Sequence, residues 1–275
     1  FLYIQAMASI GYANWSRGDK VKSYDTGKAL CEFGEIKSNI RALAIGKLNI
    51  GHSALISGDF DSAIEHYKEA IERSADPFHT KLAETMLGIC YLMQNHFQPA
   101  YEIFPKVLQF SDQYGAESMG TPVQMFLGVV SIALGQMARG FRMIQTARTY
   151  FYDNELIFFQ ALSEYTLGRL YFQIVEGSVR LTLPLILKNI SFLAREIPFS
   201  YAKGTCCYTR AIELGNGIGA RGIVGQAHLD LGLMYKLKNK ADVARPHLSE
   251  AVNIFRLSEA TTFMTKAQEA LSELS

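Results

Sequence analysis

The glycine-rich run at residues 217–222, with sequence GIGARG, is the closest approach to a nucleotide-binding motif in this chain. Its G-x-G-x-x-G spacing cradles a pyrophosphate when the run follows a strand and opens a helix. Here residues 209–214 carry a helical pattern into the run, and no alternating pattern of strands and helices occurs. We therefore interpret the run as a helix C-cap followed by a turn, and we expect no nucleotide cofactor.

The histidines and cysteines are not spaced for metal binding or catalysis. The sequence contains no H-E-x-x-H, no C-x-x-C and no G-x-S-x-G, the patterns typical of zinc sites and serine nucleophiles. A Ser-His-Asp arrangement stays open on spacing alone, but a solvated or core role is favoured for each histidine. We therefore predict no catalytic residue, no metal site and no enzymatic activity of this chain. The residues concerned are His52, His66, His79, His96, His228, His247, Cys31, Cys90, Cys206 and Cys207.

The composition is that of a folding chain with no strong charge bias. Of its 275 residues 49% are hydrophobic, and the formal net charge is +1, so neither a disordered acidic tail nor a basic nucleic-acid arm is indicated. The longest apolar stretch, residues 126–134, is well short of the ~18 to 20 residues that cross a bilayer. We expect no nucleic-acid or membrane partner. The cysteine pattern gives no disulfide framework and favours a reducing, cytoplasmic location.

A short pattern recurs along the whole chain. An apolar residue and a glycine are followed by an aromatic or small residue three positions after the glycine, and by a small residue twelve positions after it. Glycines in a helix pair let two helices approach closely, and large side chains then fill the space toward the next pair. The glycines lie at positions 11, 51, 88, 128, 168 and 232, in steps of 40, 37, 40, 40 and 64 residues.

This pattern resembles that of the tetratricopeptide-repeat family, in which L-G-x-x-Y and A-x-x-x-F mark a unit of about 34 residues. The resemblance implies an all-α fold, a right-handed superhelical solenoid of antiparallel helix pairs. We predict units at about 4–38, 44–78, 81–115 and 121–155, an irregular unit at 161–198, a degenerate one at 199–220, and a last unit at 225–275 with a C-terminal capping helix. An insert at 175–199, with a short helix at 184–195, accounts for the long step.

The first helix of each unit lines the concave face of such a solenoid, where a partner would lie. The positions one after and three before each glycine are mostly apolar, with isolated polar groups at His52 and Arg169. Such a groove suits an amphipathic helix, an apolar ligand or another segment of the same protein, although these residues could equally pack against neighbouring repeats. The predicted partner-binding residues are Tyr12, Leu48, His52, Thr85, Ile89, Met125, Val129, Tyr165 and Arg169. The Lys and Asn residues with which chaperone-binding repeats clamp a carboxylate are missing, which excludes that class.

Residues 165–177 and 219–255, together with the terminal residues 267–271, also look like the C-terminal repeat region of large bacterial adenylate/guanylate cyclases. In that family a cyclase domain and a P-loop ATPase module precede a long repeat array. The resemblance implies a regulatory module whose chemistry lies elsewhere, and the absence of an initiating Met leads us to expect a fragment of a longer protein. We predict a non-catalytic scaffold that binds a protein or its own upstream domains. The alternative is a sensor that takes a peptide or apolar ligand in its groove.

Overall fold

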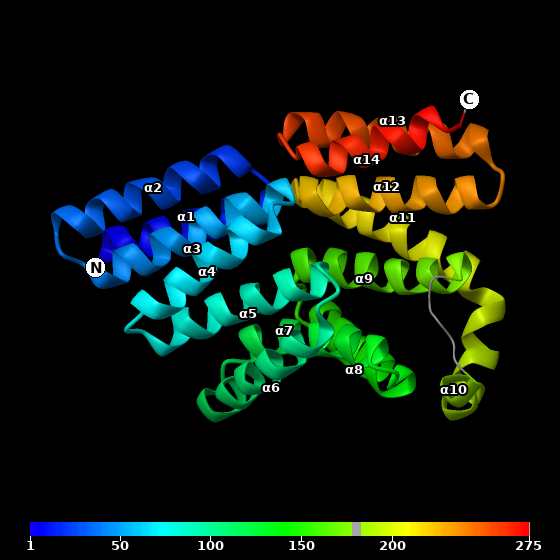
Figure 1. Cartoon of the computed structure of the whole chain (residues 1–275), viewed down its shortest axis with the longest axis horizontal. Coiled ribbons are helices and arrows are strands. Elements are labelled where there is room, and N and C mark those ends of the chain that lie inside the picture. The colour runs from blue at the N-terminus through cyan, green and yellow to red at the C-terminus, as the bar shows by residue number, and fades with distance from the viewer. Residues whose placement is uncertain (178–182, 275) are drawn as a thin grey trace. The chain divides into compact units, whose positions relative to one another are not determined.

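The computed structural model describes residues 1–177 and 183–274, and within these ranges every regular element is a helix (Figure 1). The predicted fold class, an all-α solenoid of helix pairs, is confirmed. The helices are α1 (Leu2–Arg17), α2 (Lys20–Ile36), α3 (Ile40–Ser57), α4 (Phe60–Arg73), α5 (Pro77–Met93), α6 (Phe97–Tyr114), α7 (Glu117–Ala133), α8 (Met137–Asp153), α9 (Ile157–Glu176), α10 (Leu183–Glu196), the short 3₁₀ helix η1 (Ile197–Phe199), α11 (Ser200–Ile218), α12 (Arg221–Leu237), α13 (Ala241–Leu257) and α14 (Thr261–Ser272).

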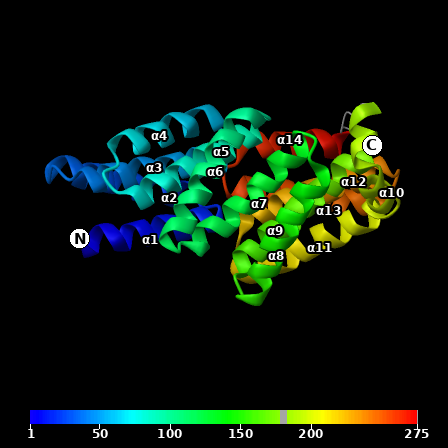
Figure 2. The same ribbon diagram turned by 90° about the horizontal axis from the view of Figure 1, so that it is seen from below.

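The chain divides into two compact units. The first contains Phe1–Val130 and Ser258–Thr262, and the second contains Ser131–Leu257 and Phe263–Ser275. In the first unit each helix from α1 to α5 packs on its successor, and α3 and α4 lie side by side in both views (Figures 1 and 2). In the second unit α9 packs against α8, α11 and α12, and α12 packs against α13.

Short polar turns stop one helix and start the next. Gly58 adopts a left-handed conformation with φ of 80° at the end of α3, which residues without a Cβ do at no steric cost. The Asp59 carboxylate then accepts the Ser62 main-chain N–H at 3.2 Å and caps α4. The run at 217–222 is built the same way, because Gly219 closes α11 with φ of 69° before α12 begins at Arg221. Its interpretation as a helix C-cap and turn is confirmed.

Gly51, Gly88 and Gly232 lie where the two helices of a pair cross. A Cβ on Gly51 would lie 2.6 Å from the Tyr67 ring, and a Cβ on Gly88 would lie 2.5 Å from the Phe104 ring. The same holds for Gly232, where a Cβ would lie 2.7 Å from Leu248. In each case the large side chain comes 16 positions after the glycine and is fully buried. The expected close approach of the two helices in a pair is therefore confirmed at these crossings.

The insertion splits one helix pair. A Cβ on Gly168 of α9 would lie 2.8 Å from the Tyr208 ring of α11, which is the same contact as in the other pairs. Tyr208 comes 40 positions after its glycine rather than 16, so the intervening segment adds 24 residues. The helices predicted to belong to separate units at 161–198 and 199–220 thus pack as one pair. The expected short helix at 184–195 is present as α10, while residues 178–182 of the predicted insert lie outside the described residues.

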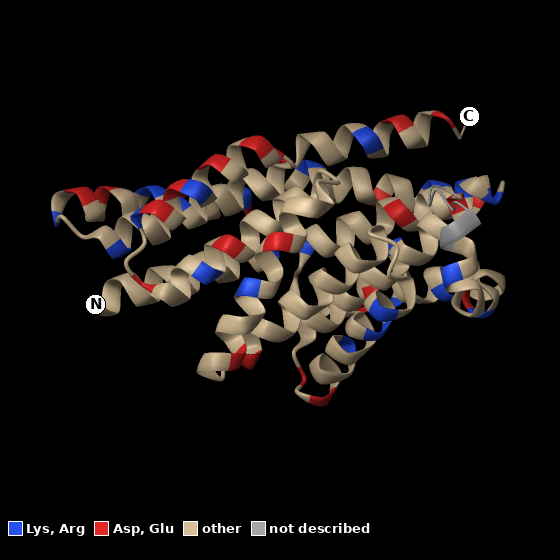
Figure 3. Ribbon diagram, turned by 60° about the horizontal axis from the view of Figure 1, so that its bottom comes forward, with Lys and Arg blue, Asp and Glu red and all other residues tan. Residues whose placement is uncertain are grey.

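Acidic and basic residues are interspersed along the helices (Figure 3), and their numbers nearly balance, with 27 Lys and Arg against 26 Asp and Glu. None of the described helices is both long enough and apolar enough to cross a membrane.

Candidate functional site

The residues predicted to bind a partner in the first unit are largely buried. Leu48 belongs to a core that also contains Tyr67 and Cys90, and half-buried Ile89 packs against it. Met125 has no exposed surface. These side chains lie against neighbouring helices, which is the packing alternative that the sequence left open.

The polar members of this group are likewise engaged within the protein. Thr85 is buried and donates its hydroxyl to the Lys81 carbonyl of its own helix at 2.8 Å. His52 is 3% exposed, and its Nδ1 is hydrogen-bonded to the Tyr67 hydroxyl at 2.9 Å. Burial lowers the pKa of His52 to about 3, so the ring is neutral. Half-buried Ile89 and Val129 and exposed Tyr12 keep some surface, and the Tyr12 ring lies 5.4 Å from that of Trp15.

In the second unit the two remaining predicted residues belong to a polar cluster. Tyr165 and Arg169 lie one turn apart on α9, and both are half-buried. Arg169 Nε lies 3.8 Å from Asp230 Oδ2 on α12, and the Tyr208 hydroxyl of α11 donates to the same oxygen at 3.4 Å. The Tyr165 hydroxyl donates to Gln226 Oε1 of α12 at 3.4 Å. We call these five residues the Arg169–Asp230 cluster.

The charges of this cluster are unequally exposed. The Asp230 side chain is 14% exposed, whereas that of Arg169 is 43% exposed. Burial raises the pKa of Asp230, and the neighbouring Arg169 opposes that rise. Burial also raises the pKa of Tyr165, so its hydroxyl remains a donor. A largely buried carboxylate therefore pairs with a partly exposed guanidinium, a group that has five N–H donors in a planar fork.

Sequence reasoning identified only two members of this cluster. Asp230 is adjacent to Leu229, the position that the spacing rule selects in its unit, and it is a charged residue between Leu229 and Leu231 in an otherwise apolar stretch. This position could therefore have pointed to Asp230 from the sequence. Gln226 and Tyr208 gave no signal, because their position depends on how α9, α11 and α12 pack.

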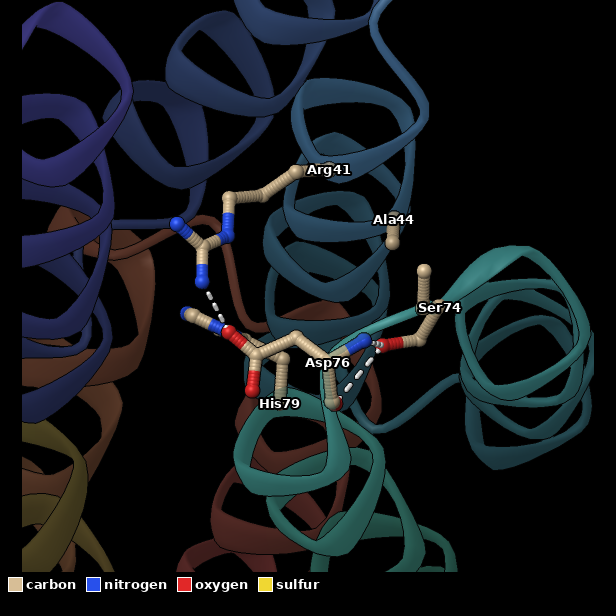
Figure 4. Close-up of a pocket in the computed structure, with 6 residues that line it drawn as sticks. Arg41, Ala44, Ser74, Asp76 and His79 are labelled. Carbon is tan, nitrogen blue, oxygen red and sulfur yellow. Dashed lines mark hydrogen bonds and ion pairs between the residues drawn. The ribbon is translucent and has the colours of Figure 1, made fainter. Parts of the chain in front are cut away.

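A cavity of about 230 Å³ in the first unit contains the three residue types of a hydrolytic triad (Figure 4). The Asp76 carboxylate is hydrogen-bonded to His79 Nδ1 at 2.9 Å and also to Arg41. The Ser74 hydroxyl, however, donates to the Asp76 main-chain carbonyl at 3.0 Å. A nucleophile must instead give its proton to the histidine. Asp76 also accepts the Phe78 N–H and so caps α5, which makes this a structural cluster.

A second cavity, of about 410 Å³, lies in the second unit. Its two cations face buried carboxylates, with Arg148 Nη2 at 2.6 Å from Glu164 Oε1 and Lys203 Nζ at 2.8 Å from Glu196 Oε2. Burial raises the pKa of the Cys207 thiol to about 12, so the sulfur is protonated and is a poor nucleophile. The lining residues are Gln145, Arg148, Leu167, Tyr171, Phe199, Ala202, Lys203, Cys206 and Cys207.

Comparisons with known proteins agree with the repeat pattern. Residues 46–77, which include Gly51 and Tyr67, match the tetratricopeptide-repeat family. The matched residues cover most of α3 and all of α4, which form one helix pair of the fold. Among curated proteins, none matches the sequence.

Solved structures share the fold at low sequence identity. A Rap protein complexed with competence and sporulation factor is 12% identical, with a TM-score of 0.66 over 99% of this chain and 85% of that one. The apo form of RapI is 14% identical, with a TM-score of 0.51 over 87% of this chain and 84% of that one. A signal-transduction ATPase with a tetratricopeptide-repeat sensor from Pyrococcus horikoshii is 12% identical, with a TM-score of 0.34 over 92% of this chain and 43% of that one.

Proposed function

We propose that this chain is a non-catalytic scaffold that binds a protein or peptide through the Arg169–Asp230 cluster. The observation that carries the proposal is a partly exposed guanidinium held by a buried carboxylate between α9 and α12, which pack against each other. Both are first helices of their pairs, and first helices line the binding face of a helical-repeat solenoid. The Rap structure supports a binding role, since a protein of this fold was solved in complex with a factor.

The cluster favours a partner that carries a carboxylate. Arg169 offers N–H donors at the surface, and a planar fork of donors matches a carboxylate bidentately. Asp230, Tyr165 and Tyr208 fix the position of the guanidinium in advance, which lowers the entropy lost on binding. The partner is therefore a segment with an acidic side chain or a free C-terminus next to apolar residues.

The resemblance of residues 165–177 and 219–255 to bacterial cyclases supports a place in a larger cytoplasmic signalling protein. In such a protein the partner is either a separate protein or the protein's own upstream domains. The repeat region then regulates or assembles catalytic domains that lie outside this chain.

The test is selection of binding peptides from a random phage-displayed library, followed by fluorescence anisotropy with the selected peptides. We expect peptides with a carboxylate to be enriched, and Arg169→Gln to weaken their binding about 10- to 100-fold, the value of a charge-assisted hydrogen bond. The control is Arg139→Gln on α8. Arg139 is exposed and donates a hydrogen bond to Gln136, one turn earlier, so its loss should not affect the Arg169–Asp230 cluster. The proposal would be contradicted if the enriched peptides bound the Arg169→Gln variant as tightly as they bind the parent chain.

A second candidate function, ligand sensing, is favoured by the cavity of about 410 Å³. Cavities of roughly 300 to 1,000 Å³ accept small molecules. Native mass spectrometry of the purified chain tests it, because a retained small molecule adds a reproducible mass. Substitution of Ala202 by Trp in the cavity lining should then abolish that mass, and its persistence would place the molecule elsewhere.

A further inference from the structure

Two histidines face each other across the α12–α13 pair. His228 Nδ1 on α12 and His247 Nδ1 on α13 are 2.9 Å apart, and their ring centroids are 5.1 Å apart. Both residues are half-buried, so each keeps some exposed surface. The Tyr235 ring stacks on His247 at 15° between planes, with 5.6 Å between centroids. Figure 1 shows α12 and α13 lying side by side over their length.

The pair can present both Nδ1 nitrogens to a metal ion without losing a proton. In the metal-free chain one Nδ1 donates and the other accepts, so a single hydrogen lies between two nitrogens. A contact of 2.9 Å between the two Nδ1 atoms requires at least one neutral ring, because a protonated imidazole has no acceptor nitrogen. Neutral imidazole is the metal-binding form. Moving the shared hydrogen from Nδ1 to Nε2 of one ring frees both Nδ1 lone pairs without changing the charge of either ring.

The distance between the nitrogens selects the kind of ion. With metal–nitrogen bonds of about 2.0 to 2.1 Å, nitrogens 2.9 Å apart subtend an angle of about 90° at the metal. A tetrahedral ion with the same bonds would need nitrogens about 3.3 Å apart. Adjacent positions of a square-planar or tetragonal ion match the observed spacing once the two rings turn to aim their Nδ1 lone pairs at the metal, and this is the geometry of Cu²⁺ and Ni²⁺.

We propose that His228 and His247 form a two-histidine site for Cu²⁺ or Ni²⁺ that links α12 to α13. Among residues 1–177 and 183–274, no set of three or more His, Cys, Asp or Glu side chains is placed to hold a metal. Water therefore completes the coordination. The site joins the two helices of one pair and does not depend on the proposed partner binding.

The site is tested by titrating the whole chain with Cu²⁺, Ni²⁺ and Zn²⁺ separately, using isothermal calorimetry and, for Cu²⁺, electron paramagnetic resonance. We expect one ion per chain and a copper spectrum with two nitrogen ligands. Ni²⁺ should bind more tightly than Zn²⁺; copper is not informative on this point, because it binds most nitrogen sites most strongly. Tighter binding of Zn²⁺ than of Ni²⁺ would overturn the assigned geometry.

Matched variants locate the site. His228→Asn and His247→Asn should each weaken Cu²⁺ and Ni²⁺ binding at least about tenfold, since even outer-shell partners of a metal contribute that much. His96→Asn is the control, because His96 is exposed at the start of α6, in the other unit, and its loss should leave affinity unchanged. Circular dichroism checks that each variant is folded. Binding that survives both substitutions, or that is lost with His96, would overturn the proposal.

Discussion

Replacing Gly88 by alanine tests whether the helix crossing requires a residue without a side chain. The added Cβ would lie 2.5 Å from Cε1 and 2.9 Å from Cζ of Phe104, about an ångström inside ordinary contact. Phe104 is fully buried and its ring stacks on that of Phe126, so it has no free space to enter. Overpacking of this kind costs about 1 to 3 kcal/mol, against which alanine regains up to about 1 kcal/mol of helix propensity.

Gly217→Ala in α11 separates these two effects. No heavy atom lies within 4 Å of the Cβ that this substitution adds, so only the gain in propensity applies. We expect the free energy of unfolding of the Gly88→Ala variant to be about 1 to 3 kcal/mol lower than that of the Gly217→Ala variant. The assay is guanidinium unfolding followed by circular dichroism, and for Gly88→Ala also by the fluorescence of Trp15, the single tryptophan, which packs on the core of the same unit.

A double-mutant cycle with Phe104→Leu shows whether the ring is the cause. Leucine removes the atoms that the new Cβ would meet, so the cost of Gly88→Ala should fall by at least about 1 kcal/mol in the Phe104→Leu background. The reasoning is refuted if Gly88→Ala stabilises the chain as much as Gly217→Ala does, or if the two substitutions are additive.

Two further predictions concern single residues of the first unit. The folded-state pKa of His52 is about 3 rather than its ordinary 6.5, so protonation of this ring favours the unfolded chain. The contribution of neutral His52 to stability is therefore complete above pH 6.5 and is lost as the pH falls toward 3. Between pH 7 and pH 5 the free energy of unfolding should fall by about 2 kcal/mol because of His52. The parent chain and His52→Gln are unfolded in guanidinium at both pH values, and the variant should lack this fall. An equal fall in the variant would show that His52 is not responsible. Asp59→Ala should lower the free energy of unfolding by about 1 kcal/mol, because it removes the cap of α4. Asp59→Asn should keep most of that stability in the same assay, since asparagine also caps helices. An equal loss in both variants would mean that Asp59 does not act as a cap.

The helix pairs could be predicted from sequence because their contacts are local and repeated. Gly51, Gly88 and Gly232 each meet a large residue 16 positions later, and a fixed separation repeated along a chain is visible without a structure. The C-cap at Gly219 was predictable for a similar reason, since a left-handed helix end depends on its own residue and its immediate neighbours.

The candidate sites depended on contacts that have no fixed spacing. Tyr208 packs on Gly168 but comes 40 positions after it, because 24 residues are inserted between the two helices. The usual separation of 16 positions is therefore hidden in the sequence, and Gly168 and Tyr208 were predicted to lie in different units. The sequence selected Arg169 by position, but not Asp230, which lies 61 positions further along and holds it in place. His228 and His247 likewise meet only because α12 and α13 pack with those two turns opposite each other.

Burial was also decided by the tertiary structure. The spacing rule selects His52 and Arg169 by the same criterion, yet His52 is enclosed by Trp15 and Tyr67 while Arg169 stays 43% exposed. A repeat pattern determines which face of a helix is turned inward, because that depends on the helical period alone. Whether a side chain on that face is covered depends on the size of the residues on adjacent helices, and these differ from one repeat to the next.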